Sequence, residues 1–103
     1  MGFLEFIFGG KKQRVEKFIT NGAIILDVRT QREWNNGHIK NSKHIPLDQL
    51  KDRLPEIKKL NKPIITVCES GMRSSNATSI LNNNGIESIN GGGWKSLNDS
   101  IAH

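Results

Sequence analysis

The sequence predicts an α/β protein built on a mainly parallel central sheet of four to five strands flanked by helices. Two apolar, β-branched runs predict buried strands at residues 23–28 and 64–68. Segments with helical spacing of apolar residues alternate with the strands, and this alternation is typical of a parallel sheet. No segment rich in Pro, Gly or Ser divides the 103 residues, which indicates one folded domain.

The first half of the chain supplies a helix, the first buried strand, a second helix and a weak strand. Apolar residues at helical spacing predict a helix over 15–19 that Asn21-Gly22 ends. The range Thr30–Glu33 has the capping-box pattern, so a short helix is expected to start there and to end near residue 35. Residues 43–45 predict a weak strand that Pro46 stops.

The second half continues the alternation. Residues 47–57 predict one or two short helices that are broken near Pro55. After the strand at 64–68, an apolar stripe predicts a helix from about Ser74 to Asn83. The remaining elements are expected in this order: a short strand at 88–89 that runs into residues 90–93, where the glycines at 91–93 form a flexible approach, and a last helix at 94–101.

Polar residues follow both strong strands at the point where each strand ends. Asp27 and Arg29 follow the first strand, and Cys68 ends the second. The carboxyl ends of parallel strands meet at one edge of a sheet, which is where α/β proteins place their sites. We therefore expect these side chains to lie near one another.

Cys68 is the only cysteine of the chain, and it opens a loop between a strand and a helix. Backbone amides at a helix start, together with the helix dipole, stabilise a thiolate and can lower a thiol pKa from about 8.5 to roughly 3.5–7.5. Gly71 permits the left-handed backbone of a tight loop, and Arg73 adds a permanent cation that can fork onto an oxyanion. These features outweigh the alternative of an inert, buried cysteine.

Three motifs in a fixed order resemble the rhodanese-like, or sulfurtransferase, domain family. They lie at residues 26–50, 67–75 and 89–94, and they read LDVRTQREWNNGHIKNSKHIPLDQL, VCESGMRSS and INGGGW. The resemblance extends from residue 23 to about 101. It implies a three-layer rhodanese-like fold for a single domain at 13–103. The N-terminus departs from the family, because the apolar residues at its start indicate an arm at 1–12 that packs on the domain or on a partner.

The resemblance also implies a function. Cys68 is then the catalytic nucleophile, which takes a sulfane sulfur as a persulfide and passes it to a thiol or to cyanide. Asp27 and Arg29 match a supporting Asp-x-Arg motif, and His38 falls in a structural signature. The substrate-binding loop, whose amides cradle the transferred sulfur, consists of Glu69, Ser70, Gly71, Met72 and Arg73. The reaction requires a small-molecule sulfur donor such as thiosulfate, and it requires no cofactor.

Other functions remain as alternatives. A cysteine phosphatase or arsenate reductase uses Cys-x5-Arg, whereas only four residues separate Cys68 from Arg73, so the loop is one residue short for a tetrahedral oxyanion. A persulfide carrier that exchanges sulfur with a protein donor or acceptor is favoured by Glu69, whose carboxylate repels dianionic thiosulfate unless it points to solvent. A non-catalytic binding module typically lacks the cysteine.

Composition disfavours several other classes. The net charge is +5, but the basic residues are scattered and Tyr is absent, so no nucleic-acid partner is expected. The apolar residues 3–8 are too few to span a membrane, and no membrane partner is expected. A lone cysteine excludes an intrachain disulfide, and His38 and His44 lack the pattern of a metal site. A cytoplasmic location is expected.

Overall fold

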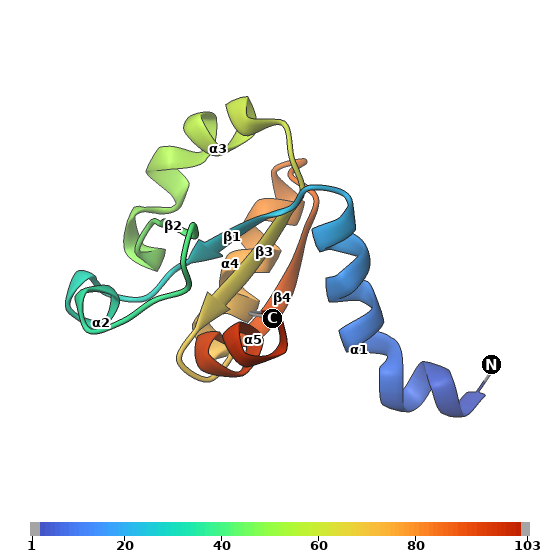
Figure 1. Ribbon diagram of the computed structural model, residues 1–103. Helices are drawn as coiled ribbons and strands as arrows, with labels where there is room; N and C mark the ends of the chain where they lie inside the picture. Colours follow the sequence, from blue (N-terminus) through green and yellow to red (C-terminus); the bar gives the residue numbers. More distant parts are fainter. Residues whose placement is uncertain (1–2, 102–103) are drawn as a thin grey trace.

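A parallel four-stranded sheet forms the centre of the protein in the computed structural model, which describes residues 3–101 and side chains from Gly10 to Ile101 (Figure 1). Its order is β2-β1-β3-β4, and each neighbouring pair is parallel. The strands are β1 (Ile24–Asp27), β2 (Lys43–His44), β3 (Ile64–Cys68) and β4 (Ser88–Gly93). The predicted α/β class with a parallel sheet is confirmed.

Helices cover both faces of this sheet (Figure 1). In chain order they are α1 (Phe3–Thr20), α2 (Gln31–Asn35), α3 (Leu54–Leu60), α4 (Met72–Asn83) and α5 (Trp94–Ile101). Short 3-10 turns at Leu47–Gln49 and Lys51–Arg53 precede α3. None of the helices in the described part of the chain combines the length and apolarity needed to cross a bilayer.

Strand β3 separates two hydrophobic cores because its side chains alternate between the faces of the sheet. Ile64 and Cys68 belong to the core under α3 and α4, which also contains Ile57 and Leu81. Ile65 and Val67 belong to the other core, under α1 and α5. All five residues of β3 are buried, which explains why this strand reads as a continuous apolar run. The fold therefore has three layers.

Two predicted boundaries differ from the observed ones. Pro55 does not break a helix but lies in the first turn of α3, where its missing N–H has no intrahelical partner to lose. Helix α4 begins at Met72, two residues before the expected start at Ser74. The predicted helix at 15–19 is the C-terminal part of α1, which also contains most of the predicted arm. Residues 1–2 of that arm lie outside the described residues, and the division at residue 12 stays a prediction.

The prediction of a flexible segment at the glycines 91–93 is wrong. These residues belong to β4, where the register against β3 shifts so that Cys68 pairs with Gly93. A Cβ atom on Gly91 would lie 2.7 Å from a methyl group of Ile65 and 2.9 Å from the Thr66 carbonyl oxygen. The glycines therefore allow β4 to approach β3 closely beside the site, which a sequence pattern alone does not distinguish from flexibility.

Candidate active site

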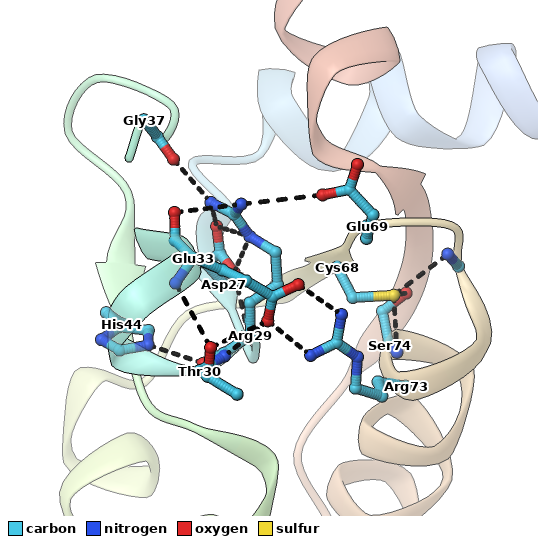
Figure 2. Close-up of polar contacts among 11 residues, drawn as sticks. Asp27, Arg29, Thr30, Glu33, Gly37, His44, Cys68, Glu69, Arg73 and Ser74 are labelled. Atoms are coloured by element: carbon cyan, nitrogen blue, oxygen red, sulfur yellow. Dashed lines mark hydrogen bonds and ion pairs between the residues drawn. The ribbon is translucent and has the colours of Figure 1, made fainter. Parts of the chain in front are cut away.

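Cys68 ends β3 at the carboxyl edge of the sheet, and polar groups surround its sulfur (Figure 2). The residue is buried, with 1% of its surface exposed. Its Sγ accepts hydrogen bonds from the N–H of Gly71 at 3.0 Å and from the N–H of Ser74 at 3.3 Å. The Ser74 hydroxyl oxygen lies 3.3 Å from the same sulfur. The loop therefore directs its polar groups inward onto one atom.

These contacts determine the ionisation of the thiol. Burial raises the pKa of Cys68, but hydrogen bonds from the Ser74 hydroxyl, the Ser74 and Gly71 amides and the Ser70 amide lower it. The bonds outweigh burial, so the pKa lies below the ordinary value of a cysteine thiol. A lowered pKa increases the fraction of thiolate, the nucleophilic form of cysteine.

The backbone conformation of Gly71 makes this arrangement possible. Gly71 precedes the first residue of α4 with φ of 102°, in the left-handed region that glycine adopts without strain. Its side-chain position faces Gly92, whose Cα would lie 3.5 Å from an added Cβ. No side chain caps the start of α4, so amides of the first turn remain available to the sulfur.

The other loop residues lie at the surface. The side chain of Met72 is 80% exposed and that of Glu69 is 55% exposed. Ser70 is exposed as well. The Glu69 carboxylate lies 3.9 Å from the guanidinium of Arg29, so it sits between solvent and the end of β1 (Figure 2).

Asp27 and Arg29, the predicted supporting residues, form a buried ion pair next to the loop. The guanidinium donates to both carboxylate oxygens over 2.8–3.0 Å. It also donates to the Gly37 carbonyl at 2.8 Å and lies 4.6 Å from the ring centroid of Trp94. The pair therefore ties the end of β1 to the segment after α2 and to the start of α5.

Arg73 pairs with a carboxylate. Its two terminal nitrogens donate to the two oxygens of Glu33 at 2.7 and 2.9 Å (Figure 2). Glu33 also accepts from the Thr30 N–H in the predicted capping box, which the structure confirms. The pKa of Glu33 is lowered to about 2, mainly by the hydrogen bonds from Arg73 and to a smaller extent by the bond from the Thr30 N–H. The fork of Arg73 thus joins α4 to α2.

Sequence reasoning missed two polar residues at the site, Ser74 and Asn90. The Ser74 hydroxyl donates to Oδ1 of Asn90 at 2.6 Å, and the Asn90 Nδ2 donates to the Gly71 carbonyl at 3.0 Å. Ser74 follows the recognised loop directly, which was a usable signal. Asn90 lies within the motif at 89–94, but its contacts with Ser74 and Gly71 depend on the position of β4 and were not predicted.

His38 and His44 make structural contacts. The His38 ring stacks on Trp34 with a centroid distance of 3.5 Å, and its Nδ1 lies 2.9 Å from the Trp34 carbonyl oxygen. Nε2 of His44 lies 2.7 Å from the carbonyl oxygen of Arg29. Within residues 3–101, no group of three or more His, Cys, Asp and Glu side chains is placed to hold a metal ion.

The fold and the site together define a class, in which a strand-to-helix loop of a parallel α/β sheet surrounds a cysteine sulfur. The family model described as "Rhodanese-like domain" matches residues 11–99. The chain therefore belongs to the rhodanese-like domain family.

Individual relatives agree with this membership. The chain is 35% identical over 100 residues to the "Uncharacterized protein YqhL" of Bacillus subtilis, and the match covers 87% of this chain and 79% of that protein. A rhodanese-like domain protein from Staphylococcus aureus has a similar crystal structure, with a TM-score of 0.67, 37% identity and 74% of each chain covered. The tRNA uridine(34) hydroxylase of Escherichia fergusonii is 29% identical over 72 aligned positions, and the match covers 65% of this chain and only 21% of that enzyme.

Proposed function

We propose that this protein is a sulfurtransferase that takes a sulfane sulfur onto Cys68 as a persulfide and passes it to a thiol or to cyanide. The observation that carries the proposal is the pair of hydrogen bonds from the Gly71 and Ser74 amides to Sγ. They favour the thiolate without a neighbouring histidine. Membership in the rhodanese-like family supports the same chemistry.

The reaction has two displacement steps. The Cys68 thiolate attacks the outer sulfur of a donor such as thiosulfate, a new S–S bond forms, and the donor's S–S bond breaks so that sulfite leaves with the electron pair. An acceptor thiolate or cyanide then attacks the outer sulfur, and Cys68 leaves as a thiolate. Because the chain has no second cysteine, the acceptor is an external molecule, and ping-pong kinetics are expected.

The loop is proposed to receive the outer sulfur. We expect a sulfur atom bound to Sγ to point toward the backbone of residues 69–73, because the amides of Gly71 and Ser74 already face Sγ. A helix start with uncapped amides stabilises the negative charge that the outer sulfur carries. The same loop is one residue shorter than the phosphatase Cys-x5-Arg loop, which disfavours a phosphate-sized substrate.

A second candidate is a persulfide carrier that is fed by a protein partner. It is favoured by the charges near the loop, because Arg73 is paired with Glu33 and Arg29 with Asp27. The Glu69 carboxylate is more than half exposed beside them. A dianion such as thiosulfate gains little attraction from paired guanidiniums and is repelled by Glu69, whereas a protein persulfide carries less charge.

The test is the intact mass of the protein after incubation with thiosulfate, with a polysulfide and with a persulfidated donor protein, each in separate samples. We expect the mass of one sulfur atom to be added, and we expect no addition in Cys68→Ser. Loading by all donors supports the general sulfurtransferase, whereas loading by the protein donor alone supports the carrier. No adduct with any donor would contradict both, and turnover of an aryl phosphate would favour the phosphatase.

A further inference from the structure

The orientation of the Asn90 amide follows from two backbone groups. The N–H of Gly92 can only donate, and it lies 2.9 Å from Oδ1 of Asn90. The carbonyl of Gly71 can only accept, and it lies 3.0 Å from Nδ2. Reversing the amide would break both bonds. The carbonyl oxygen of the Asn90 side chain therefore faces Ser74, and it acts there only as an acceptor.

This orientation also determines where the Ser74 proton points. A serine hydroxyl has one proton, and the 2.6 Å contact with Oδ1 of Asn90 requires that proton. The lone pairs of Ser74 then face the sulfur of Cys68 at 3.3 Å, where they can accept the S–H of the thiol. Ser74 is completely buried, at 0% exposure, so its hydroxyl forms its hydrogen bonds with Cys68 and Asn90 and not with bulk solvent.

Loss of the thiol proton changes the balance between the two acceptors. The Cys68 thiolate has no proton to donate, and lone pairs of Ser74 that face it would repel it. Rotation about the Cβ–Oγ bond of Ser74 brings the same hydroxyl proton from Asn90 to the sulfur. A hydrogen bond to a charged acceptor is stronger than one to a neutral amide oxygen, so the thiolate competes successfully for this proton.

We propose that Ser74 and Asn90 act together as a positioning pair: Asn90 holds the Ser74 proton while Cys68 is a thiol, and Ser74 turns this proton to Sγ when Cys68 is a thiolate. The proton that leaves is the thiol's own, and it goes to solvent. Ser74 keeps its proton throughout, and the Asn90 oxygen keeps its bond from the Gly92 N–H.

The pair has a consequence for sulfur transfer, and this part of the inference rests on the proposed function. In the persulfide, Sγ is bonded to a second sulfur and carries little charge, so the Ser74 proton returns to Asn90. When the acceptor removes the outer sulfur, Cys68 leaves as a thiolate and Ser74 donates to it again. The pair thus stabilises the leaving group at the step that releases sulfur.

Asn90 has a second contact that a test must separate from the first, because its Nδ2 holds the Gly71 carbonyl while the Gly71 N–H donates to the sulfur. The charged groups around the loop are unchanged in every variant used below. They come from β1 and the residues after it, from α2, from the loop, from α4 and from α1: Asp27, Arg29, Glu33, Glu69, Arg73 and Lys11. The Lys11 ammonium lies over Gly92.

The experiment measures the pKa of Cys68 from the ultraviolet absorbance of its thiolate and from its alkylation rate against pH. Ser74→Ala should raise the pKa by about one unit, equal to a roughly tenfold lower thiolate-to-thiol ratio. Asn90→Leu should lower it, because the Ser74 proton is then always available to the sulfur. The double variant should match Ser74→Ala alone, and Ser75→Ala, an exposed change on the same helix turn, should leave the pKa unchanged.

Three results would contradict the proposed roles of Ser74 and Asn90. They are an unchanged Cys68 pKa in Ser74→Ala, a raised or unchanged Cys68 pKa in Asn90→Leu, and an effect of Asn90→Leu on this pKa that persists in the Ser74→Ala background. The last would show that Asn90 acts through Gly71. If Asn90→Leu does not fold, Asn90→Ala takes its place. The titration uses no sulfur donor, so its outcome is independent of the intact-mass experiment, and a chain that titrates as expected but takes no sulfur would contradict only the proposed function.

Discussion

The carboxyl ends of the two strands at the site, β3 and β1, differ in how charged groups near them are stabilised. After β3, backbone amides and one hydroxyl surround a single sulfur atom, and no charged side chain is among the hydrogen-bonding groups that lower the pKa of Cys68. After β1, charged side chains form ion pairs: Asp27 pairs with Arg29, and Glu33 of α2 pairs with Arg73, which reaches across from the first turn of α4. The ion pairs hold the segments together, whereas the hydrogen bonds to the reactive sulfur come from backbone amides and one neutral side chain. Arg73 interacts with the charge of Cys68 only through Coulombic attraction, without a hydrogen bond to the sulfur.

This difference has a physical consequence. Amide dipoles keep their direction as long as the backbone keeps its conformation, and they do not titrate. Ion pairs depend on pH and salt instead. The β3 loop should therefore be sensitive to backbone substitutions, and the β1 edge to acid. The predictions below compare the two regions in order of decreasing effect.

The largest effect is expected from Gly71→Ala, with Gly85→Ala as its matched control. Both glycines have positive φ, 102° and 78°, and a left-handed alanine costs about 1–2 kcal/mol of stability at either position. An alanine at Gly85 meets no atom within 4 Å. Only Gly71→Ala should raise the Cys68 pKa and slow persulfide formation, by about tenfold for one lost bond to the thiolate.

Urea unfolding and the thiolate titration measure these two quantities separately. If Cys68 has the same pKa in both alanine variants, the hydrogen bonds to its sulfur do not depend on the conformation of Gly71, and the prediction is wrong. A loss of stability confined to Gly71→Ala would instead indicate a packing effect against Gly92.

A smaller effect is expected from Glu33→Gln at the β1 edge. The pKa of Glu33 is lowered from 4.5 to about 2, so its carboxylate stabilises the fold fully above pH 4.5, and this stabilisation is lost as the pH falls through about 2. The variant should be less stable than the parent at neutral pH, and the difference should shrink between pH 4.5 and about 2. Urea midpoints across this range measure it.

Glu56→Gln is the control, because it breaks the exposed ion pair between Glu56 on α3 and Arg53 in the 3-10 turn that precedes this helix. It should change stability less than Glu33→Gln and leave sulfur loading unchanged. If the stability difference between the parent and Glu33→Gln stays constant with pH, the ion pair of Glu33 with Arg73 is not the cause of that difference.

The smallest effect is expected from Glu69→Gln. The Glu69 carboxylate is largely in solvent, so removing its charge should lower the KM for thiosulfate only about two- to threefold, which is the scale of an exposed charge pair. The change should disappear at about 1 M salt, where the Debye length is about 3 Å. An unchanged KM at low salt would place Glu69 away from the path of the donor and remove its support for the carrier.

Much of the fold could be predicted because its signals are local. Both strong strands form where apolar runs predicted them; Ile64–Cys68 is buried throughout, and Ile24–Asp27 is buried at its carboxyl end. The Thr30–Glu33 pattern forms its capping box as expected. Gly91 shows the limit of this reasoning. Glycine is needed there because β4 packs against Ile65, and the same residue type is also typical of flexible loops.

The order of residues alone was enough for the parallel α/β class, for the edge at which Cys68 lies and for the rhodanese-like family, because each depends on a periodicity or a short motif. The partners of the site depended on folding. Arg73 meets Glu33 across 40 positions, and Ser74 meets Asn90 across 16. Neither pair has a spacing signal, because strand register and the close approach of β4 bring these side chains together only in the folded sheet.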